Sequence, residues 1–274
     1  MKKYFYLNGK ISDLDKPAIQ INDIGLLRGY AVFDFMRTYQ GKVFHWKDHF
    51  KRFISSAKTL NLKIPISEND ILKAINILMK KNRVKDCSVR LVLSGGPTED
   101  GLTYKRPTFA ILIEDIYSFP KKYYQDGIKL ITFDYLRLLP KTKNTNYIWA
   151  VKLASLRKKK KALEVLYTSD DKILEASTAN FFLFKGATLI TPKDNILRGI
   201  TRKIILKLAR DDFKIEEREV KLNELDSATE AFITGTNKLI MPVVMVDNNK
   251  IGDGKVGDNT KKLMKKFNDY LNSF

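Results

Sequence analysis

The chain has 274 residues, of which 44% are hydrophobic and 30% are charged, a balance typical of soluble globular proteins. This length can form one large domain or two smaller ones with cores of their own. No apolar run reaches the roughly 18 residues of a membrane span, and the start, Met1–Tyr6, lacks the apolar stretch of a secretory signal. The single cysteine, Cys87, excludes an intramolecular disulfide. We therefore expect a cytoplasmic protein without a membrane segment.

The charge is strongly positive, with 50 Lys and Arg against 31 Asp and Glu and a net charge of +19. Such an excess suggests a nucleic-acid partner. The densest basic run, Arg157–Lys161, lies at the C-terminal end of a predicted helix, where cations are favourable. No RNA- or DNA-binding motif accompanies it. We expect a solvated basic surface and no nucleic acid, and a nucleic-acid-binding protein remains the non-enzymatic alternative.

The N-terminal part reads as two hairpins followed by helices and strands. Residues 4–11 turn at Asn8-Gly9, and residues 31–44 turn at Gln40-Gly41. Apolar residues then recur at helical spacing from Trp46 to Leu60, which predicts a helix with His49 and Arg52 on one side. Further elements expected here are a helix from after Ser67 to about Lys81 and strands over 88–94 and 108–114.

The segment 118–126, with Pro120, two lysines and two tyrosines, predicts a linker between a domain over 1–117 and a domain over 127–274. Beyond it, many strands alternate with few helices, which favours α+β lobes. The strands expected are 128–133, 165–168, 172–175, 181–184, 189–191, 215–220, 231–234 and 240–246, and the helices are 147–161, 201–210 and 258–271.

Lys143 stands between an apolar run and the predicted helix 147–161. A desolvated lysine has a lowered pKa, and its neutral amine can form a Schiff base with an aldehyde. Most lysines are solvated surface charges, so Lys143 is singled out by the motifs around it. They are His49-x-x-Arg52 upstream, and Glu175-x-Ser177-x-x-Asn180, Leu197-Arg198-Gly199-Ile200-Thr201 and Thr234-Gly235-Thr236 downstream.

In this order and at these separations, the motifs resemble those of class IV aminotransferases, the fold-type IV enzymes that use pyridoxal 5′-phosphate. The family includes branched-chain aminotransferases, D-amino-acid transaminases and aminodeoxychorismate lyases. The resemblance extends from about Phe5 to Gly257. It implies a two-domain α+β fold, with a small N-terminal α/β domain and a larger pseudo-barrel C-terminal domain. It also implies a homodimer in which the neighbouring subunit contributes residues to each site.

By this resemblance, Lys143 holds the cofactor as a Schiff base and then moves a proton between the substrate α-carbon and the cofactor. Glu175 keeps the pyridine nitrogen protonated, so that the ring can accept electrons. Leu197 packs on a ring face, and Tyr147 bonds to the ring hydroxyl.

The phosphate of the cofactor is expected to meet the Arg52 guanidinium, which offers a charged fork. Ile200 and Thr201 open a helix, where backbone N–H groups and the helix dipole favour an anion. Thr236 can add a hydroxyl. We expect no metal, because His45 and His49 share helical spacing but have no third ligand nearby.

Three residues are candidates for substrate binding: Arg28, Phe33 and Arg90. Arg90 lies in an apolar strand, where burial of an arginine is costly without a partner. Either a substrate carboxylate or a buried Asp or Glu is therefore expected beside it. Phe33 precedes Asp34, where a glutamate commonly follows the aromatic residue in the family.

The substrate enantiomer depends on which side of the ring binds the carboxylate. The Lys143-x-x-Asn146 spacing resembles that of D-amino-acid transaminases and the lyases, whereas Tyr147 and Arg90 resemble the branched-chain group. We expect a transaminase that moves an amino group to a 2-oxo acid such as 2-oxoglutarate, and we favour a D-amino-acid donor over a branched-chain L-amino acid. Aminodeoxychorismate lyase, which releases pyruvate without an acceptor, is the enzymatic alternative.

Overall fold

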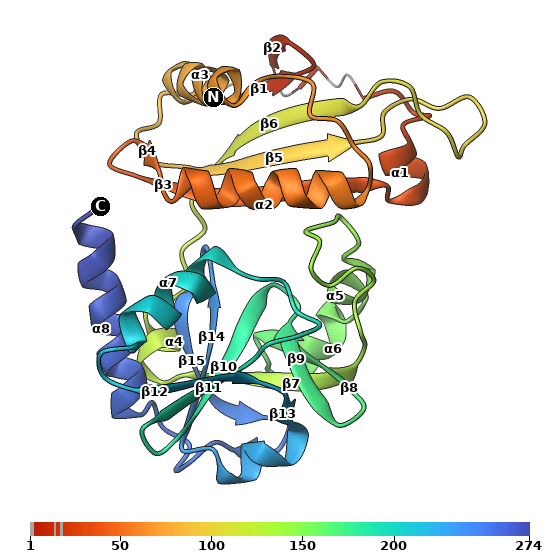
Figure 1. The fold of residues 1–274 in the computed structure, drawn as a ribbon. Helices are drawn as coiled ribbons and strands as arrows, with labels where there is room; N and C mark the ends of the chain where they lie inside the picture. Colours follow the sequence, from red (N-terminus) through yellow and green to blue (C-terminus); the bar gives the residue numbers. More distant parts are fainter. Residues whose placement is uncertain (1–2, 14, 17–18) are drawn as a thin grey trace. The chain divides into compact units, whose positions relative to one another are not determined.

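The computed structural model describes residues 3–13, 15–16 and 19–274. The chain divides into two compact units (Figure 1). Unit 1 contains residues 1–117 together with 142–146, and unit 2 contains residues 118–141 and 147–274. The segment that carries Lys143 therefore groups with the N-terminal unit, although it is distant from it in sequence.

Unit 1 contains an antiparallel sheet with the strand order β2-β1-β6-β5-β3-β4. Both predicted hairpins are confirmed. In the first, Asn8 and Gly9 have positive φ angles of 45° and 92°, the left-handed conformation that a tight two-residue turn requires. The strands are β1 (Tyr4–Leu7), β2 (Lys10–Asp13), β3 (Ala31–Tyr39), β4 (Lys42–Val43), β5 (Ser88–Ser94) and β6 (Thr108–Glu114).

The predicted amphipathic helices of unit 1 are confirmed as α2 (Trp46–Thr59) and α3 (Glu68–Lys81), and a short helix that was not predicted, α1 (Ile24–Arg28), precedes β3. Ser67 caps α3 by accepting the backbone N–H of Asp70. Both helices contribute apolar side chains to the same core as the sheet. The buried face of α2 also contains the polar residues His49 and Ser56. Buried polar side chains need hydrogen-bond partners.

Unit 2 is built around a closed ring of strands, β10-β14-β15-β7-β8-β9, in which β9 pairs back to β10. Closure removes free edges and encloses a continuous apolar core. The α+β fold with a larger barrel-like C-terminal part is therefore confirmed. The ring strands are β7 (Ile128–Asp134), β8 (Glu164–Ser169), β9 (Lys172–Ala176), β10 (Ala179–Lys185), β14 (Glu230–Gly235) and β15 (Leu239–Val246). Outside the ring lie β11 (Thr188–Pro192), β12 (Lys214–Arg218), β13 (Val220–Lys221) and β16 (Asn249–Lys250).

One helix prediction in unit 2 is wrong. The single helix expected over 147–161 is two short helices separated at Leu153, whose φ and ψ are −83° and 0°. No proline or glycine is present to signal the break, which coincides with burial of Leu153 in a core cluster. The helices of unit 2 are α4 (Lys122–Gln125), α5 (Ile148–Lys152), α6 (Ala154–Lys159), α7 (Ile200–Ala209), the 3₁₀ helix η1 (Leu222–Ser227) and α8 (Asp258–Asn272). Within the described residues, no helix has the length and apolar character needed to cross a membrane.

The N-terminus of α8 is capped by a side chain from β14. Glu230 accepts the backbone N–H groups of Asn259 and Thr260 at 3.0 and 2.7 Å. A Cβ at Gly257 would lie 2.1 Å from the Glu230 carboxyl carbon, so glycine leaves room for this cap. We expect Glu230→Ala to lower the free energy of unfolding by about 1–3 kcal/mol in urea denaturation, because two helix donors lose their acceptor. Asn268→Ala, at an exposed position of α8, should lose less than about 0.5 kcal/mol, and equal losses in the two variants would contradict the capping role.

Candidate functional site

The centre of the first cluster is Asp34, a fully buried carboxylate in the middle of β3. His49 lies with its Nδ1 2.7 Å from Asp34 Oδ1. Arg52 donates from Nε to Asp34 Oδ2 at 2.8 Å and from Nη2 to Oδ1 at 2.7 Å. His49 and Arg52 lie one turn apart on α2, so the prediction that they share a side is confirmed. The two-pronged bond fixes the orientation of the guanidinium.

Charge and burial act in opposite directions on this cluster. Burial alone would raise the pKa of Asp34, but the adjacent Arg52 charge and the bonds from His49 and Arg52 hold that pKa well below its usual range. Burial lowers the pKa of His49. A neutral His49 therefore carries its proton on Nδ1, where it can donate to the carboxylate. At neutral pH the cluster contains one ion pair, Asp34–Arg52, and a neutral imidazole.

The segment with Lys143 is held beside this cluster by its backbone. The Lys143 N–H donates to Ser56 Oγ at 3.1 Å, and its carbonyl accepts the N–H of Phe33 at 2.9 Å. The Lys143 Nζ lies 4.6 Å from the centroid of the Phe33 ring, and the Lys143 charge contributes to the lowered pKa of His49. The structure therefore brings Lys143 close to Phe33 of β3 and to the Asp34–His49–Arg52 cluster of β3 and α2.

Arg90 has a protein carboxylate as its partner. Its Nε and Nη2 donate to Glu114 at 2.5 and 3.0 Å, and its guanidinium lies 5.5 Å from the Phe33 ring centroid. Of the two partners expected for this arginine, the structure shows a protein carboxylate, but Glu114 is 35% exposed and not buried as expected. Arg28 lies at the end of α1, and its exposed Nη1 donates to the Leu27 carbonyl at 3.0 Å.

The second cluster lies in unit 2 around Glu175. Glu175 in β9 and Asn180 in β10 are direct cross-strand partners. The buried Glu175 carboxylate accepts Arg137 Nη1 at 2.8 Å on Oε1 and the Leu197 N–H at 3.1 Å on Oε2. Asn180 Nδ2 donates to the Leu197 carbonyl at 2.7 Å. Glu175 and Asn180 thus fix both backbone polar groups of Leu197.

The loop after Leu197 leads directly into α7. A Cβ at Gly199 would lie 2.2 Å from the Asn180 Oδ1, so only glycine fits this position. Ile200 and Thr201 form the first turn of α7, and its N-cap residue, Gly199, has no side chain that could cap it. The backbone N–H groups at this helix start and the helix dipole suit an anion.

Thr236 lies in the turn between β14 and β15, which is tied to a neighbouring turn. Gly235 approaches the Thr178 carbonyl, where an added Cβ would lie 3.2 Å away. Lys238 donates to Thr178 Oγ1 at 2.5 Å and pairs with the buried Glu164 at 2.8 Å. Burial alone would raise the pKa of Glu164, but the Lys238 charge and the hydrogen bonds from Lys238, Ser177 and Thr178 together lower that pKa. The ion pair therefore holds the Thr236 turn in place.

Sequence reasoning assigned no role to Asp34, Arg137, Asn180 or Lys238. A signal was present for two of them, because Asp34 and Arg137 each interrupt an apolar run. The same signal drew attention to Arg90. The structure shows that Asp34 and Arg137 are buried, whereas the Arg90 side chain is 34% exposed. Lys238 carries no such signal, because its partner Glu164 is distant in sequence.

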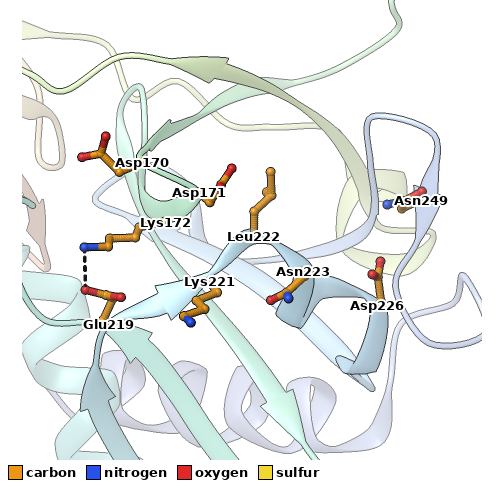
Figure 2. Close-up of a pocket in the computed structure, with 9 residues that line it drawn as sticks. All are labelled: Asp170, Asp171, Lys172, Glu219, Lys221, Leu222, Asn223, Asp226 and Asn249. Atoms are coloured by element: carbon orange, nitrogen blue, oxygen red, sulfur yellow. Dashed lines mark ion pairs between the residues drawn. The ribbon is translucent and has the colours of Figure 1, made fainter.

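A surface hollow of about 710 Å³ in unit 2 contains none of the predicted site residues (Figure 2). It adjoins Lys172, which pairs with Glu219 at 2.9 Å, at the end of β9 opposite to Glu175. Across residues 3–13, 15–16 and 19–274, no group of three His, Cys, Asp or Glu side chains is arranged to hold a metal ion. The hollow is lined by Asp170, Asp171, Lys172, Glu219, Lys221, Leu222, Asn223, Asp226 and Asn249.

Two curated relatives match nearly the whole chain. A protein of Methanocaldococcus jannaschii named as a putative branched-chain-amino-acid aminotransferase is 35% identical, over 96% of this chain and 95% of its own. A D-alanine aminotransferase of Staphylococcus haemolyticus is 27% identical, over 98% of each chain. The two relatives thus carry names for different substrates.

The fold also matches solved structures. The branched-chain amino acid aminotransferase of Escherichia coli superposes with a TM-score of 0.91 at 23% identity, over 99% of this chain and 95% of that one. Another branched-chain amino acid aminotransferase, solved with pyridoxamine 5′-phosphate, gives the same TM-score and identity over all of this chain. At this identity the matches establish a shared fold.

The family assignment follows from a family model and from the relatives together. The model for amino-transferase class IV matches residues 31–246, which include β3 with Asp34 and extend to the end of β15. The match spans most of the chain, and the relative from Methanocaldococcus jannaschii exceeds 30% identity over nearly all of it. The chain belongs to the class IV aminotransferase family.

Proposed function

We propose that this aminotransferase binds pyridoxal 5′-phosphate and moves an amino group from an amino acid to a 2-oxo acid such as 2-oxoglutarate. When bound, this cofactor supplies an aldehyde that condenses with amines and a ring that accepts electrons. The observation that carries the proposal is the position of Lys143, which two backbone hydrogen bonds hold beside the Asp34–His49–Arg52 cluster.

The side chains fit the chemical groups of this cofactor. Arg52 presents a guanidinium that Asp34 has already oriented, which suits a phosphate. The start of α7, with Ile200 and Thr201, and the Thr236 turn add N–H and hydroxyl donors. Glu175 is a buried carboxylate that can pair with a protonated ring nitrogen.

The remaining assignments extend those roles. Leu197, whose backbone is fixed by Glu175 and Asn180, would pack against the ring, and Tyr147 would bond to the ring hydroxyl. The Lys143 amine would take the proton from the substrate α-carbon and return it to the cofactor carbon. Arg28, Phe33 and Arg90 would bind the substrate, with Phe33 already in contact with Lys143 and Arg90.

The donor is proposed to be a D-amino acid, with a branched-chain L-amino acid as the second candidate. The first is supported by the D-alanine aminotransferase relative, and the second by the Methanocaldococcus jannaschii relative. We also propose that the protein is a homodimer, on the basis of the motif resemblance. We propose a cytoplasmic location because the chain has a single cysteine, Cys87, which is buried and whose pKa is raised by burial.

The test is an absorbance spectrum of the purified protein with pyridoxal 5′-phosphate, followed by D-glutamate or L-leucine in separate cuvettes. A visible band that only D-glutamate bleaches supports the D-amino-acid donor, and bleaching by L-leucine alone supports the branched-chain donor. The absence of any band would contradict the cofactor. Pyruvate release from aminodeoxychorismate without a 2-oxo acid would instead identify a lyase.

A further inference from the structure

Arg137 is a buried arginine in unit 2 that the proposed function has not yet used. It lies just after β7, and its side chain is 7% exposed. Its Nη1 donates to Glu175 Oε1 at 2.8 Å. Its Nη2 is also buried, and among the described residues it has no hydrogen-bond partner. A buried donor without a partner is costly in free energy. The ion pair with Glu175 provides a partner for Nη1 but none for Nη2.

The position of Arg137 links two residues proposed to contact the cofactor ring. On one side it pairs with Glu175, assigned to the ring nitrogen. On the other side, its guanidinium carbon lies 5.7 Å from the centroid of the Tyr147 ring, assigned to the ring hydroxyl. In pyridoxal phosphate the ring nitrogen and the carbon that carries the ring hydroxyl are bonded to the same ring carbon, so one cation can act on both groups.

Arg202 provides a comparison within the same unit. Its side chain is also 7% exposed and pairs with a glutamate, Glu217, at 2.9 Å. It too leaves a buried nitrogen, Nε, without a partner among the described residues. An unpaired nitrogen therefore does not by itself assign a ligand. Arg137 differs from Arg202 in its neighbours, because it binds Glu175 and lies near the Tyr147 ring, and both of these residues are proposed to contact the cofactor.

We propose that Arg137 is a positioning residue for the ring of the bound cofactor, which holds the Glu175 carboxylate ionised and fixed and offers Nη2 to an anionic oxygen of the same ligand. This inference rests on the proposed function. Its physical consequence is electrostatic, because a fixed cation beside the ring opposes the addition of protons to the groups attached to the ring. The bound cofactor should therefore titrate at a lower pH than it would without this charge.

The experiment compares Arg137→Met, Arg137→Lys and the control Arg202→Met in the full-length protein. The apo-proteins are titrated with pyridoxal 5′-phosphate, and the absorbance of each complex is then followed against pH. We expect Arg137→Met to weaken cofactor binding by about 10- to 100-fold, since a charge-assisted hydrogen bond is lost. The titration midpoint should rise by roughly one pH unit, since a nearby positive charge is removed.

Arg137→Lys separates charge from geometry. It keeps the positive charge, so the midpoint should stay near the wild-type value, but it loses the fork and should bind the cofactor more weakly. Arg202→Met should lose stability without a change in midpoint. If Arg137→Met does not fold, Arg137→Lys still tests the assignment. An Arg137→Lys protein that binds the cofactor with the same affinity as the wild-type protein, and titrates at the same midpoint, would overturn it.

Two outcomes distinguish failure of this inference from failure of the proposed function. A wild-type protein that shows no saturable absorbance change with pyridoxal 5′-phosphate would refute the proposed function, and the assignment of Arg137 with it. A wild-type protein that binds normally, with an Arg137→Met midpoint equal to that of Arg202→Met, would refute the assignment of Arg137 alone.

Discussion

Replacing Lys143 with alanine should abolish transamination, with a loss in kcat of roughly 10⁴- to 10⁶-fold, the range found when an essential covalent catalytic group is removed. The fold should persist, because the Lys143 segment is attached through its backbone. The N–H bond to Ser56 and the carbonyl bond from Phe33 do not require the lysine side chain. The measurement is steady-state transamination, together with urea unfolding to verify the fold.

The matched control is Lys141→Ala, which removes an exposed lysine two residues away. It should retain wild-type activity and the same absorbance spectrum. Lys143→Ala should still bind pyridoxal 5′-phosphate through the other cofactor residues, but without the visible band that depends on the lysine amine. A full wild-type band in Lys143→Ala, or an equal loss of activity in Lys141→Ala, would show that Lys143 is not the catalytic lysine.

The parts of the fold that follow from local physics could be predicted from the sequence. The Asn8-Gly9 turn needs two positive φ angles, and these residue types adopt them readily. The amphipathic pattern of α2 and the Ser67 cap of α3 likewise lie within a few residues of one another. The break at Leu153 could not be predicted, because it accompanies burial of that side chain in tertiary structure and no residue there disfavours a helix.

The same distinction applies to the site. The five-residue separation of Glu175 and Asn180 has a simple cause: a two-residue turn between β9 and β10 makes them cross-strand partners. The glycine at position 199 is explained by the Asn180 side chain, which leaves no room for a Cβ. These motif positions could be read from the sequence, whereas the Arg137 bond to Glu175, across 38 residues, required the fold.

Asp34 shows why a buried charge is hard to assign from sequence. Its strand register places it opposite Leu91 in β5, so its backbone neighbours give no hint of a charge partner. The partners come from α2, on the face that also contributes Phe50 and Phe53 to the core. The carboxylate in an apolar strand indicated that a partner existed, but not that the partner was Arg52.

Replacing Asp34 with alanine should lower the free energy of unfolding by about 3–5 kcal/mol, because removal of one partner leaves the Arg52 charge buried without its carboxylate. It should also weaken the binding of pyridoxal 5′-phosphate, since the orientation of Arg52 is lost. Urea denaturation and cofactor titration measure the two effects. Asp115→Ala is the control, because Asp115 pairs with Lys3 at 2.6 Å but is 81% exposed, and such pairs contribute about 0–1 kcal/mol.

The pH dependence gives an independent test of the same carboxylate. The pKa of Asp34 is lowered in the folded state from its ordinary value of 3.8, so the folded protein binds fewer protons at this group than the unfolded chain. The stabilisation is therefore fully present above the ordinary pKa and is lost as the pH falls below it. From pH 7 to acid, the wild-type protein should lose more stability than Asp34→Asn, which has no proton to gain at this position. Parallel stability curves for the two proteins, or a loss in Asp34→Ala no larger than in Asp115→Ala, would show that the Asp34–Arg52 pair does not stabilise unit 1.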